Sequence, residues 1–250
     1  METIKTIWDE QTTVRSADTD FLQRWKLSGF FAAMQEVASH HAANLGYDYR
    51  DMLERDIIWV LSRAKVRFHA FPQMGEPVHL QTWPKGLQQK IFFMRDFFIT
   101  GADGRKLADA SLAYVLINTR MRRILPPAAL GGQIPDNNGR NAIEEPLEKI
   151  PPVDALEEML ALQANYSTVD LMGHVNNARY IDWISDCFTF DQHRQHIPGW
   201  LQINFINEVR PGEQVRILRG ARPEDPRAWY ICGENATTGS KAFDAEFGWA

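Results

Sequence analysis

The sequence has little cysteine, no long apolar run and no excess of basic charge, and each of these features excludes a class of protein. Only two of the 250 residues are cysteines, Cys187 and Cys232. So few argue against a disulfide framework or a zinc site and fit a reducing compartment. No apolar window approaches the length of a membrane span, and the first residues lack the apolar run of a signal peptide. We therefore expect a cytoplasmic protein that does not associate with membranes.

The charge balance and the missing motifs exclude further classes. The chain carries 27 Lys and Arg against 32 Asp and Glu, a net charge of −5, so no global basic field favours nucleic acid. It has no glycine-rich phosphate loop and no nucleophile elbow, and its paired histidines lack the context of a metal site. We expect no cofactor and no metal. The hydrophobic content of 44% is that of an ordinary globular protein.

Hydrophobic periodicity predicts the elements of the first half. Apolar residues recur at helical spacing from Trp25 to Leu45, and Gly46 is well placed to end that helix. The period then changes to two in residues 59–68, where Val60 is expected on the apolar face. Three more strand candidates follow, each bounded by Gly, Pro or a charged turn. The pattern predicts a strand, a long helix and four antiparallel strands.

The same order returns in the second half. A strand is expected at 161–169 and a helix at 176–190, and four strand candidates follow. Asp20 precedes the first helix as Asp170 precedes the second, and "MGEPVHL" at 74–80 matches "PGEQVRI" at 211–217. The sequence therefore predicts an α+β protein of two tandem repeats, each an antiparallel sheet wrapped around a long helix.

Between the repeats lies a stretch rich in Pro, Gly and Asn without a clear period. A connector of this length is unusual inside a compact domain, and it suits a link that crosses from one repeat to the other. We expect a first repeat at 1–125, a connector at 126–157 and a second repeat at 158–250.

The start of the second helix gathers polar residues. Asn176 or Asn177 can cap the helix, whose exposed N–H groups and positive dipole end suit a developing oxyanion. His174 precedes this end, where the dipole disfavours its protonated form. The alternative is an ordinary capped helix with a surface histidine.

Glu208 is the second candidate for chemistry. Strand alternation would place it on one face with Gln202 and Asn204, where partial desolvation would raise its pKa towards that of a general base. The alternative is a glutamate in solvent at a sheet edge, or one paired with Arg210.

The stretch "DLMGHVNNARYIDW", residues 170–183, resembles the motif D-x-N-x-H-V-N-N-x-x-Y-x-x-W of the acyl-ACP thioesterases. These are double hot-dog enzymes of fatty acid synthesis, and the resemblance, to the bacterial type, extends over nearly the whole chain. It implies hydrolysis of fatty acyl-acyl carrier protein (ACP) to free fatty acid, without a cofactor.

The resemblance also implies roles for individual residues. Glu208 would activate a water that attacks the thioester carbonyl. His174 and the N–H groups of the helix start, with Asn176 and Asn177, would bind and polarise the carbonyl oxygen. Asp170 would position His174 or the neighbouring backbone.

The first repeat would then hold the acyl chain. Phe30, Phe31 and Met34 on its helix are the bulky candidates for chain-length control, although core packing would use the same residues. This repeat is expected to lack the catalytic site, because Arg24 stands where His174 would be if Asp20 matches Asp170.

Two positions depart from the family pattern. Met172 stands where the family usually has Asn, and Asn204, Asn207 or a backbone amide would have to compensate. Val209 stands where plant members often carry Cys, so a cysteine nucleophile is excluded there; Cys187 is expected in the core. Two alternatives remain: an acyl-CoA thioesterase, and a non-catalytic acyl-thioester-binding hot-dog protein, which Met172 favours.

An acidic partner such as ACP requires a local basic patch. Arg120–Arg123 ("RMRR") and the group Arg63, Lys65 and Arg67 are the options, although either could be a solvated basic face. Pairing of two chains into a homodimer is left open.

Overall fold

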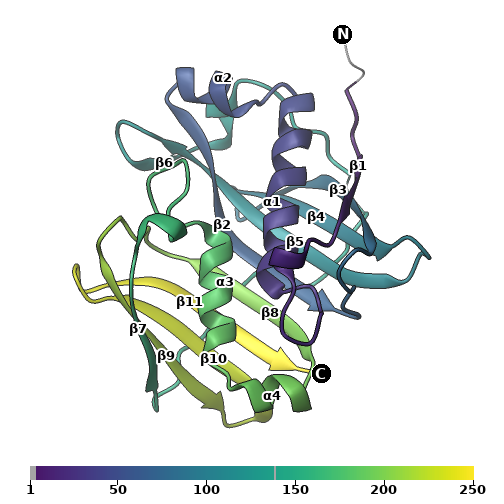
Figure 1. Ribbon diagram of the computed structural model, residues 1–250. Coiled ribbons are helices and arrows are strands. Elements are labelled where there is room, and N and C mark those ends of the chain that lie inside the picture. Colours follow the sequence, from purple (N-terminus) through teal and green to yellow (C-terminus); the bar gives the residue numbers. More distant parts are fainter. Residues whose placement is uncertain (1–3, 138) are drawn as a thin grey trace.

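The protein is built on one antiparallel sheet with its two longest helices on the same face (Figure 1). The computed structural model describes residues 4–137 and 139–250. The first half contains β1 (Trp8–Thr13), α1 (Leu27–Asn44), α2 (Tyr49–Glu54), β2 (Ile57–Phe68), β3 (Pro77–Gln88), β4 (Phe92–Gly101), β5 (Lys106–Asn118) and β6 (Arg123–Leu125). The second half contains β7 (Glu157–Gln163), α3 (Asn177–Asp186), α4 (Phe190–Gln195), β8 (Pro198–Phe205), β9 (Gln214–Arg222), β10 (Asp225–Asn235) and β11 (Ser240–Trp249).

The strand order is the same in the two halves. It runs β1-β3-β4-β5-β2 in the first half and β7-β9-β10-β11-β8 in the second. The inner strands β2 and β8 pair antiparallel, with Val66 opposite Leu201, and join the halves into one sheet. This pairing satisfies both inner edges, which would otherwise expose unpaired backbone groups. The prediction of two tandem hot-dog repeats is confirmed.

Helices α1 and α3 contact each other and pack on the sheet (Figure 1). One apolar core extends through both repeats, from Phe30 and Met34 on α1 to Ile181 and Ile184 on α3. Gly46, with φ +85°, follows the end of α1 and adopts the left-handed conformation that glycine reaches without strain. None of the helices in residues 4–137 and 139–250 combines the length and the apolar character of a membrane span.

The facing of one strand and the ends of two elements differ from the sequence prediction. A bulge between Leu61 and Arg63 reverses the facing of β2, so Val60 packs on the opposite side from Ala64. The strand expected at 161–169 ends at Gln163, because the chain turns there into a short 3₁₀ segment. The helix expected at 176–190 ends at Asp186, and Thr189 caps a separate helix, α4, with a capping box.

The connector lies against the outer face of the sheet, opposite the helices. Its Ile143, Leu147 and Ile150 are buried, and the carbonyl of Glu148 accepts hydrogen bonds from the Gln202 and Asn204 side chains at 2.9 and 3.2 Å. This face also holds one of the two predicted basic groups. Arg63 donates to the Leu147 carbonyl, and Arg67 pairs with Glu145. The connector therefore occupies two members of the group Arg63, Lys65 and Arg67.

A buried polar cluster lies beside α1. His41 is fully buried; its Nδ1 accepts from Arg95 Nη1 at 2.8 Å, and its Nε2–H donates to the Lys5 carbonyl at 2.9 Å. Burial and the Arg95 charge lower the pKa of His41 to about 4, so the ring is neutral at pH 7.

Candidate active site

A tight turn before α3 is organised by Asp170. The Asp170 N–H donates to the His174 carbonyl at 3.0 Å, and its Oδ1 accepts from the Met172 N–H at 2.8 Å. Gly173 completes the turn with φ +77°, a conformation that strains residues with a Cβ. These bonds fix the backbone of His174 immediately before the helix.

The next residues form the start of α3. Asn176 is the N-cap, since its Oδ1 accepts from the Ala178 N–H at 2.9 Å, and its amide also donates to Asp170 Oδ2 at 3.4 Å. Asn177 is the first helical residue, and among the described residues no acceptor meets its backbone N–H. The capped start therefore leaves one free N–H donor at the positive end of the helix dipole.

His174 lies in the same turn, three residues before Asn177. Its side chain is 26% exposed, and its Nδ1 lies 4.0 Å from Asp170 Oδ1 and 3.4 Å from the Val175 carbonyl. The Asp170 carboxylate is thus near the imidazole but beyond ordinary hydrogen-bond length. The Asp170 carboxylate instead accepts hydrogen bonds from the Met172 N–H and the Asn176 amide.

The segment after β8 brings Glu208 to the same place. The Val175 N–H donates to the Val209 carbonyl at 2.8 Å, a bond that joins the residue after His174 to the residue after Glu208. The two side chains, 34 positions apart in the sequence, therefore lie on adjoining backbone segments. The structure brings together His174, Glu208, Asp170 and the α3 start.

The route to Glu208 differs from the prediction. Strand β8 ends at Phe205, and the N–H groups of Ile206 and Asn207 both donate to the Ala242 carbonyl, at 2.9 and 3.1 Å. This irregularity breaks the alternation, so Glu208 does not share the face of Gln202 and Asn204. That expectation was wrong, because it extended the strand through a segment that bends.

The environment of Glu208 also differs from the prediction. Its Oε1 accepts from Arg210 Nε at 3.0 Å and from Arg122 Nη2. Desolvation alone would raise the pKa of Glu208, but the two guanidinium groups and the nearby His174 together lower it below its usual value. The expected rise was wrong, and the alternative of a pair with Arg210 is confirmed. Glu208 is therefore ionised at neutral pH, the form that a general base requires.

The first repeat contains the same backbone frame with different side chains. The Trp25 N–H donates to the Pro72 carbonyl at 2.9 Å, as Val175 does to Val209, and Asp20 bonds to its own turn as Asp170 does. By this match Arg24 takes the place of His174, as expected, and Phe71 takes that of Glu208. The Arg24 guanidinium lies 5.8 Å from the Phe71 ring centroid and donates to the His193 carbonyl of α4. No acid stands in this position, so the frame lacks a base.

The predicted acyl-chain residues lie in the core. Phe30, Phe31 and Met34 are 0%, 1% and 0% exposed and face the sheet from α1. The Phe30 ring packs 4.2 Å from that of Trp25. Among the described residues, no hydrogen bond, ion pair or ring contact joins the three to Glu208 or His174.

Neither of the two asparagines expected to compensate for Met172 does so. Asn204 bonds to the connector on the outer face, and the Asn207 side chain donates to the Lys241 carbonyl at 2.8 Å. Met172 contributes its backbone N–H to Asp170, a role that does not depend on its side chain.

Cys187 is buried at the end of α3, as expected, and burial raises the pKa of its thiol to about 12. Among residues 4–137 and 139–250, no three His, Cys, Asp or Glu side chains are grouped to hold a metal ion.

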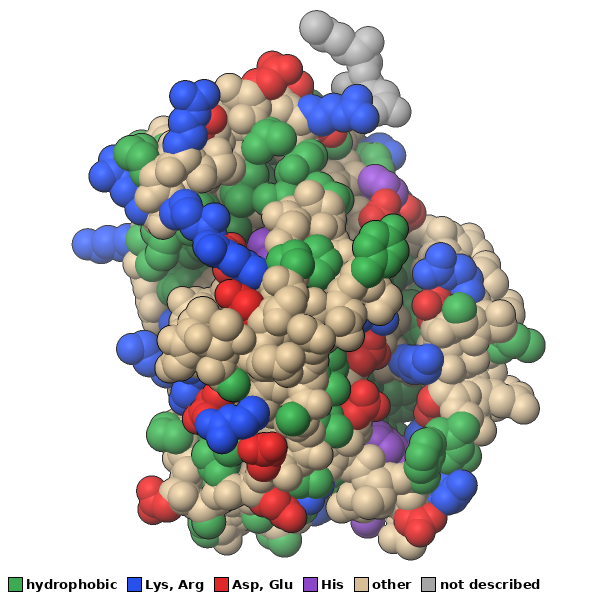
Figure 2. All heavy atoms as spheres, turned by 60° about the vertical axis from the view of Figure 1, so that its left-hand side comes forward, with side chains coloured by type: hydrophobic (Ala, Val, Ile, Leu, Met, Phe, Trp, Pro, Cys, Tyr) green, Lys and Arg blue, Asp and Glu red, His purple; other side chains and the backbone are tan. Residues whose placement is uncertain are grey.

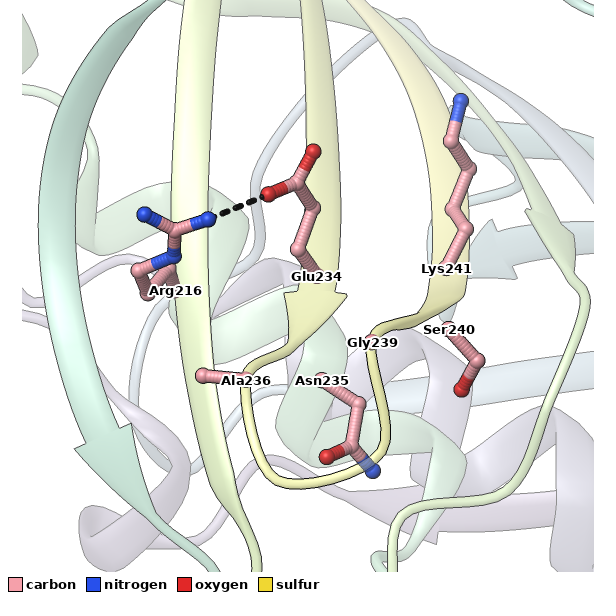
Figure 3. Close-up of a pocket in the computed structure, with 7 residues that line it drawn as sticks. All are labelled: Arg216, Glu234, Asn235, Ala236, Gly239, Ser240 and Lys241. Carbon is pink, nitrogen blue, oxygen red and sulfur yellow. Dashed lines mark hydrogen bonds and ion pairs between the residues drawn. The ribbon is translucent and has the colours of Figure 1, made fainter.

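A separate surface hollow of about 550 Å³ lies at the β10–β11 hairpin (Figure 3). Arg216 and Glu234 form a 2.8 Å ion pair at its wall, and Asn235, Ser240 and Lys241 complete much of the lining. None of the predicted site residues lines it.

Comparison with known proteins identifies the family. Residues 5–127 match the acyl-ACP thioesterase N-terminal domain, and residues 153–244 match the C-terminal domain. An oleoyl-acyl carrier protein thioesterase of Arabidopsis thaliana is 23% identical, over 93% of this chain and 68% of its own length. A palmitoyl-acyl carrier protein thioesterase of Cuphea hookeriana is 31% identical, over 60% of this chain and 39% of its own length.

Solved structures share the fold. An acyl-ACP thioesterase from Bacteroides thetaiotaomicron superposes with a TM-score of 0.88 at 22% identity, covering 98% of each chain. The 12:0-ACP thioesterase from Umbellularia californica gives 0.83 at 21% identity, covering 99% of this chain and 95% of its own. With both domains matched in order and the double hot-dog fold present, the chain belongs to the acyl-ACP thioesterase family, a family of thioester hydrolases.

Proposed function

We propose that this protein releases free fatty acid from acyl-ACP and that Glu208 is the general base. The observation that carries the proposal is the Val175–Val209 backbone bond, which brings an ionised glutamate beside His174 and the start of α3. A base, a polar ring and a free helix N–H at one place are what hydrolysis of a thioester by water requires.

The steps follow from these groups. Glu208 accepts a proton from a water molecule, whose oxygen attacks the thioester carbonyl carbon. The carbonyl oxygen becomes an oxyanion, which the Asn177 N–H, the α3 dipole and His174 stabilise. The carbon–sulfur bond then breaks, and the proton held by Glu208 passes to the departing thiolate. Asp170 and Asn176 hold the turn and the helix start in register.

The two repeats would divide the work. The first repeat, residues 1–125, would receive the acyl chain along α1, and the second, residues 158–250, would carry out the chemistry, with residues 126–157 as connector. Phe30, Phe31 and Met34 support this division as bulky apolar residues at the centre of the first repeat. They are fully buried, so an entering chain must displace them.

The carrier protein would approach on the side of the β5–β6 turn. Arg120, Arg122 and Arg123 are exposed there, and Figure 2 shows basic side chains gathered on the upper left of this face. An acidic carrier in the cytoplasm would be attracted to such a patch. Of the two basic groups in the sequence, this one is favoured by its exposure. Arg120 and Arg122 pair with acids, but all three arginines are exposed, whereas the other group is only half-exposed on the face that the connector covers.

The test compares Glu208→Gln with Glu246→Gln in hydrolysis of acyl-ACP. Glu246 also pairs with an arginine, Arg222, but lies on β11 away from the turn. We expect Glu208→Gln to lower kcat by at least about 100-fold, because the amide cannot accept the proton, and Glu246→Gln to leave it unchanged. Normal turnover in Glu208→Gln would overturn the proposal.

Two alternatives would give other results. An acyl-CoA thioesterase would hydrolyse CoA and ACP thioesters equally well. A non-catalytic acyl-thioester-binding protein would retain the thioester intact for hours, and the Met172 departure is the feature that favours it.

A further inference from the structure

An arginine in the turn between β5 and β6, in the first repeat, contacts a residue of the second repeat. Arg122 pairs with Glu208, 86 positions later in the sequence. Its N–H donates to the Asn118 carbonyl at 2.8 Å, and Asn118 Oδ1 accepts from the Met121 N–H at 2.8 Å. In the same turn, Arg120 Nε donates to Asp56 Oδ1 at 2.8 Å. The position of Arg122 is thus fixed by the fold of its own repeat.

Both guanidinium groups bind the same oxygen of Glu208. Arg122 Nη2 and Arg210 Nε and Nη2 all lie against Oε1, the last two at 3.0 Å. In the part of the chain that the structure describes, no group donates to Oε2. One carboxylate oxygen is held from two sides, and the other is left for a water molecule.

We propose that Arg122 is a positioning residue for catalysis: reaching across from the first repeat, it holds Oε1 of Glu208 with Arg210 so that Oε2 meets the attacking water. This inference rests on the proposed role of Glu208 as the base. It makes the active site a joint product of both repeats, although all the groups that would touch the reacting atoms belong to the second.

The arrangement has a consequence for the pH dependence of the reaction. Desolvation of Glu208 raises its pKa, and Arg210, Arg122 and His174 more than offset it. Without Arg122, desolvation is opposed by fewer positive charges, so the pKa of Glu208 rises. Because only the ionised carboxylate acts as a base, the acidic limb of the rate profile must then move to higher pH.

Arg122→Gly is a clean perturbation. Arg122 has φ +50°, in the left-handed region that glycine adopts without strain, so the substitution removes the guanidinium without disfavouring the turn. The control is Arg105→Ala. Arg105 is comparably exposed and pairs with Glu76 at 3.1 Å, so this variant also removes the arginine of an arginine–glutamate ion pair. The substrate is a short acyl thioester of N-acetylcysteamine, so that contacts with the carrier protein do not contribute.

We expect Arg122→Gly to lower kcat at least about tenfold, with KM changed by less than about twofold and the acidic limb moved to higher pH. Arg122→Lys, which keeps the charge but not the planar fork, should recover part of the rate. Arg105→Ala should match wild type in both readouts, and thermal unfolding should show that all variants are folded.

A wild-type kcat and acidic limb in Arg122→Gly would overturn the inference, as would a loss confined to KM. The two proposals fail separately. If Glu208→Gln remains active, the role of the base is wrong. If Glu208→Gln is inactive while Arg122→Gly behaves as wild type, only the role of Arg122 is wrong.

Discussion

Removing the cap of α3 should damage activity far more than stability. In Asn176→Ala the Ala178 N–H loses its 2.9 Å partner, and Asp170 Oδ2 loses a longer bond at 3.4 Å. Loss of an N-cap costs about 1 kcal/mol, and the long second bond adds little. For a chain of this size, that corresponds to a fall in Tm of about 2–4 °C.

The second repeat offers a matched control. Thr189 caps α4, accepting from the Gln192 N–H at 3.2 Å, and Thr189→Ala should also cost about 1 kcal/mol. Only the α3 cap adjoins His174 and the free Asn177 N–H. A small displacement of these groups should lower kcat about tenfold or more in Asn176→Ala, with no change in Thr189→Ala.

The assay combines thermal unfolding with steady-state hydrolysis of an acyl thioester. Asn176→Ser, which keeps a capping oxygen, should restore the Tm and recover part of the kcat. Equal kcat values in Asn176→Ala and Thr189→Ala, at equal loss of Tm, would refute the reasoning that the α3 start is part of the site.

Three further predictions concern the pH dependence, the thiols and the turn before α3. The unfolded chain takes up a proton on His41 near pH 6.5 and the folded chain only near pH 4. As the pH falls from 6.5 to 4, this residue should therefore lower the free energy of unfolding by about 2–4 kcal/mol. Denaturant titrations should show a shallower acid dependence of this free energy in His41→Gln, and an unchanged slope would contradict the assignment. Iodoacetamide at pH 8 should leave Cys187 unmodified in the folded protein and label it after denaturation, because its pKa is about 12; rapid labelling of the folded protein would disprove this. Gly173→Ala and Gly104→Ala place a Cβ at φ +77° and +80° with open space around both, so each should cost about 1–2 kcal/mol, but only Gly173→Ala should lower kcat.

Much of the fold could be predicted because it depends on local patterns. The helical period of α1 and the alternation of the strands are properties of short windows, and the duplicated order of elements identified the two repeats. The capped start of α3 was also predictable, since Asn176 bonds within its own turn. Val60 was misplaced because a bulge depends on how two strands pair, which the sequence of one strand does not record.

The environment of Glu208 could not be predicted for a different reason. Its pKa depends on Arg122, which comes from another repeat and meets Glu208 only through the tertiary fold. Nothing in the local sequence distinguishes Arg122 from Arg120, which pairs with Asp56. The bend after Phe205 likewise depends on the Ala242 carbonyl of a neighbouring strand.

The account is tested most directly by thiol release from a panel of short, medium and long acyl-ACPs and their CoA counterparts, with wild type beside Glu208→Gln. We predict rapid release from a limited range of acyl-ACPs, slower release from the matching CoA thioesters, and loss of both in Glu208→Gln. Intact retention of every thioester by the wild type, or equal release by the wild type and Glu208→Gln, would contradict the account.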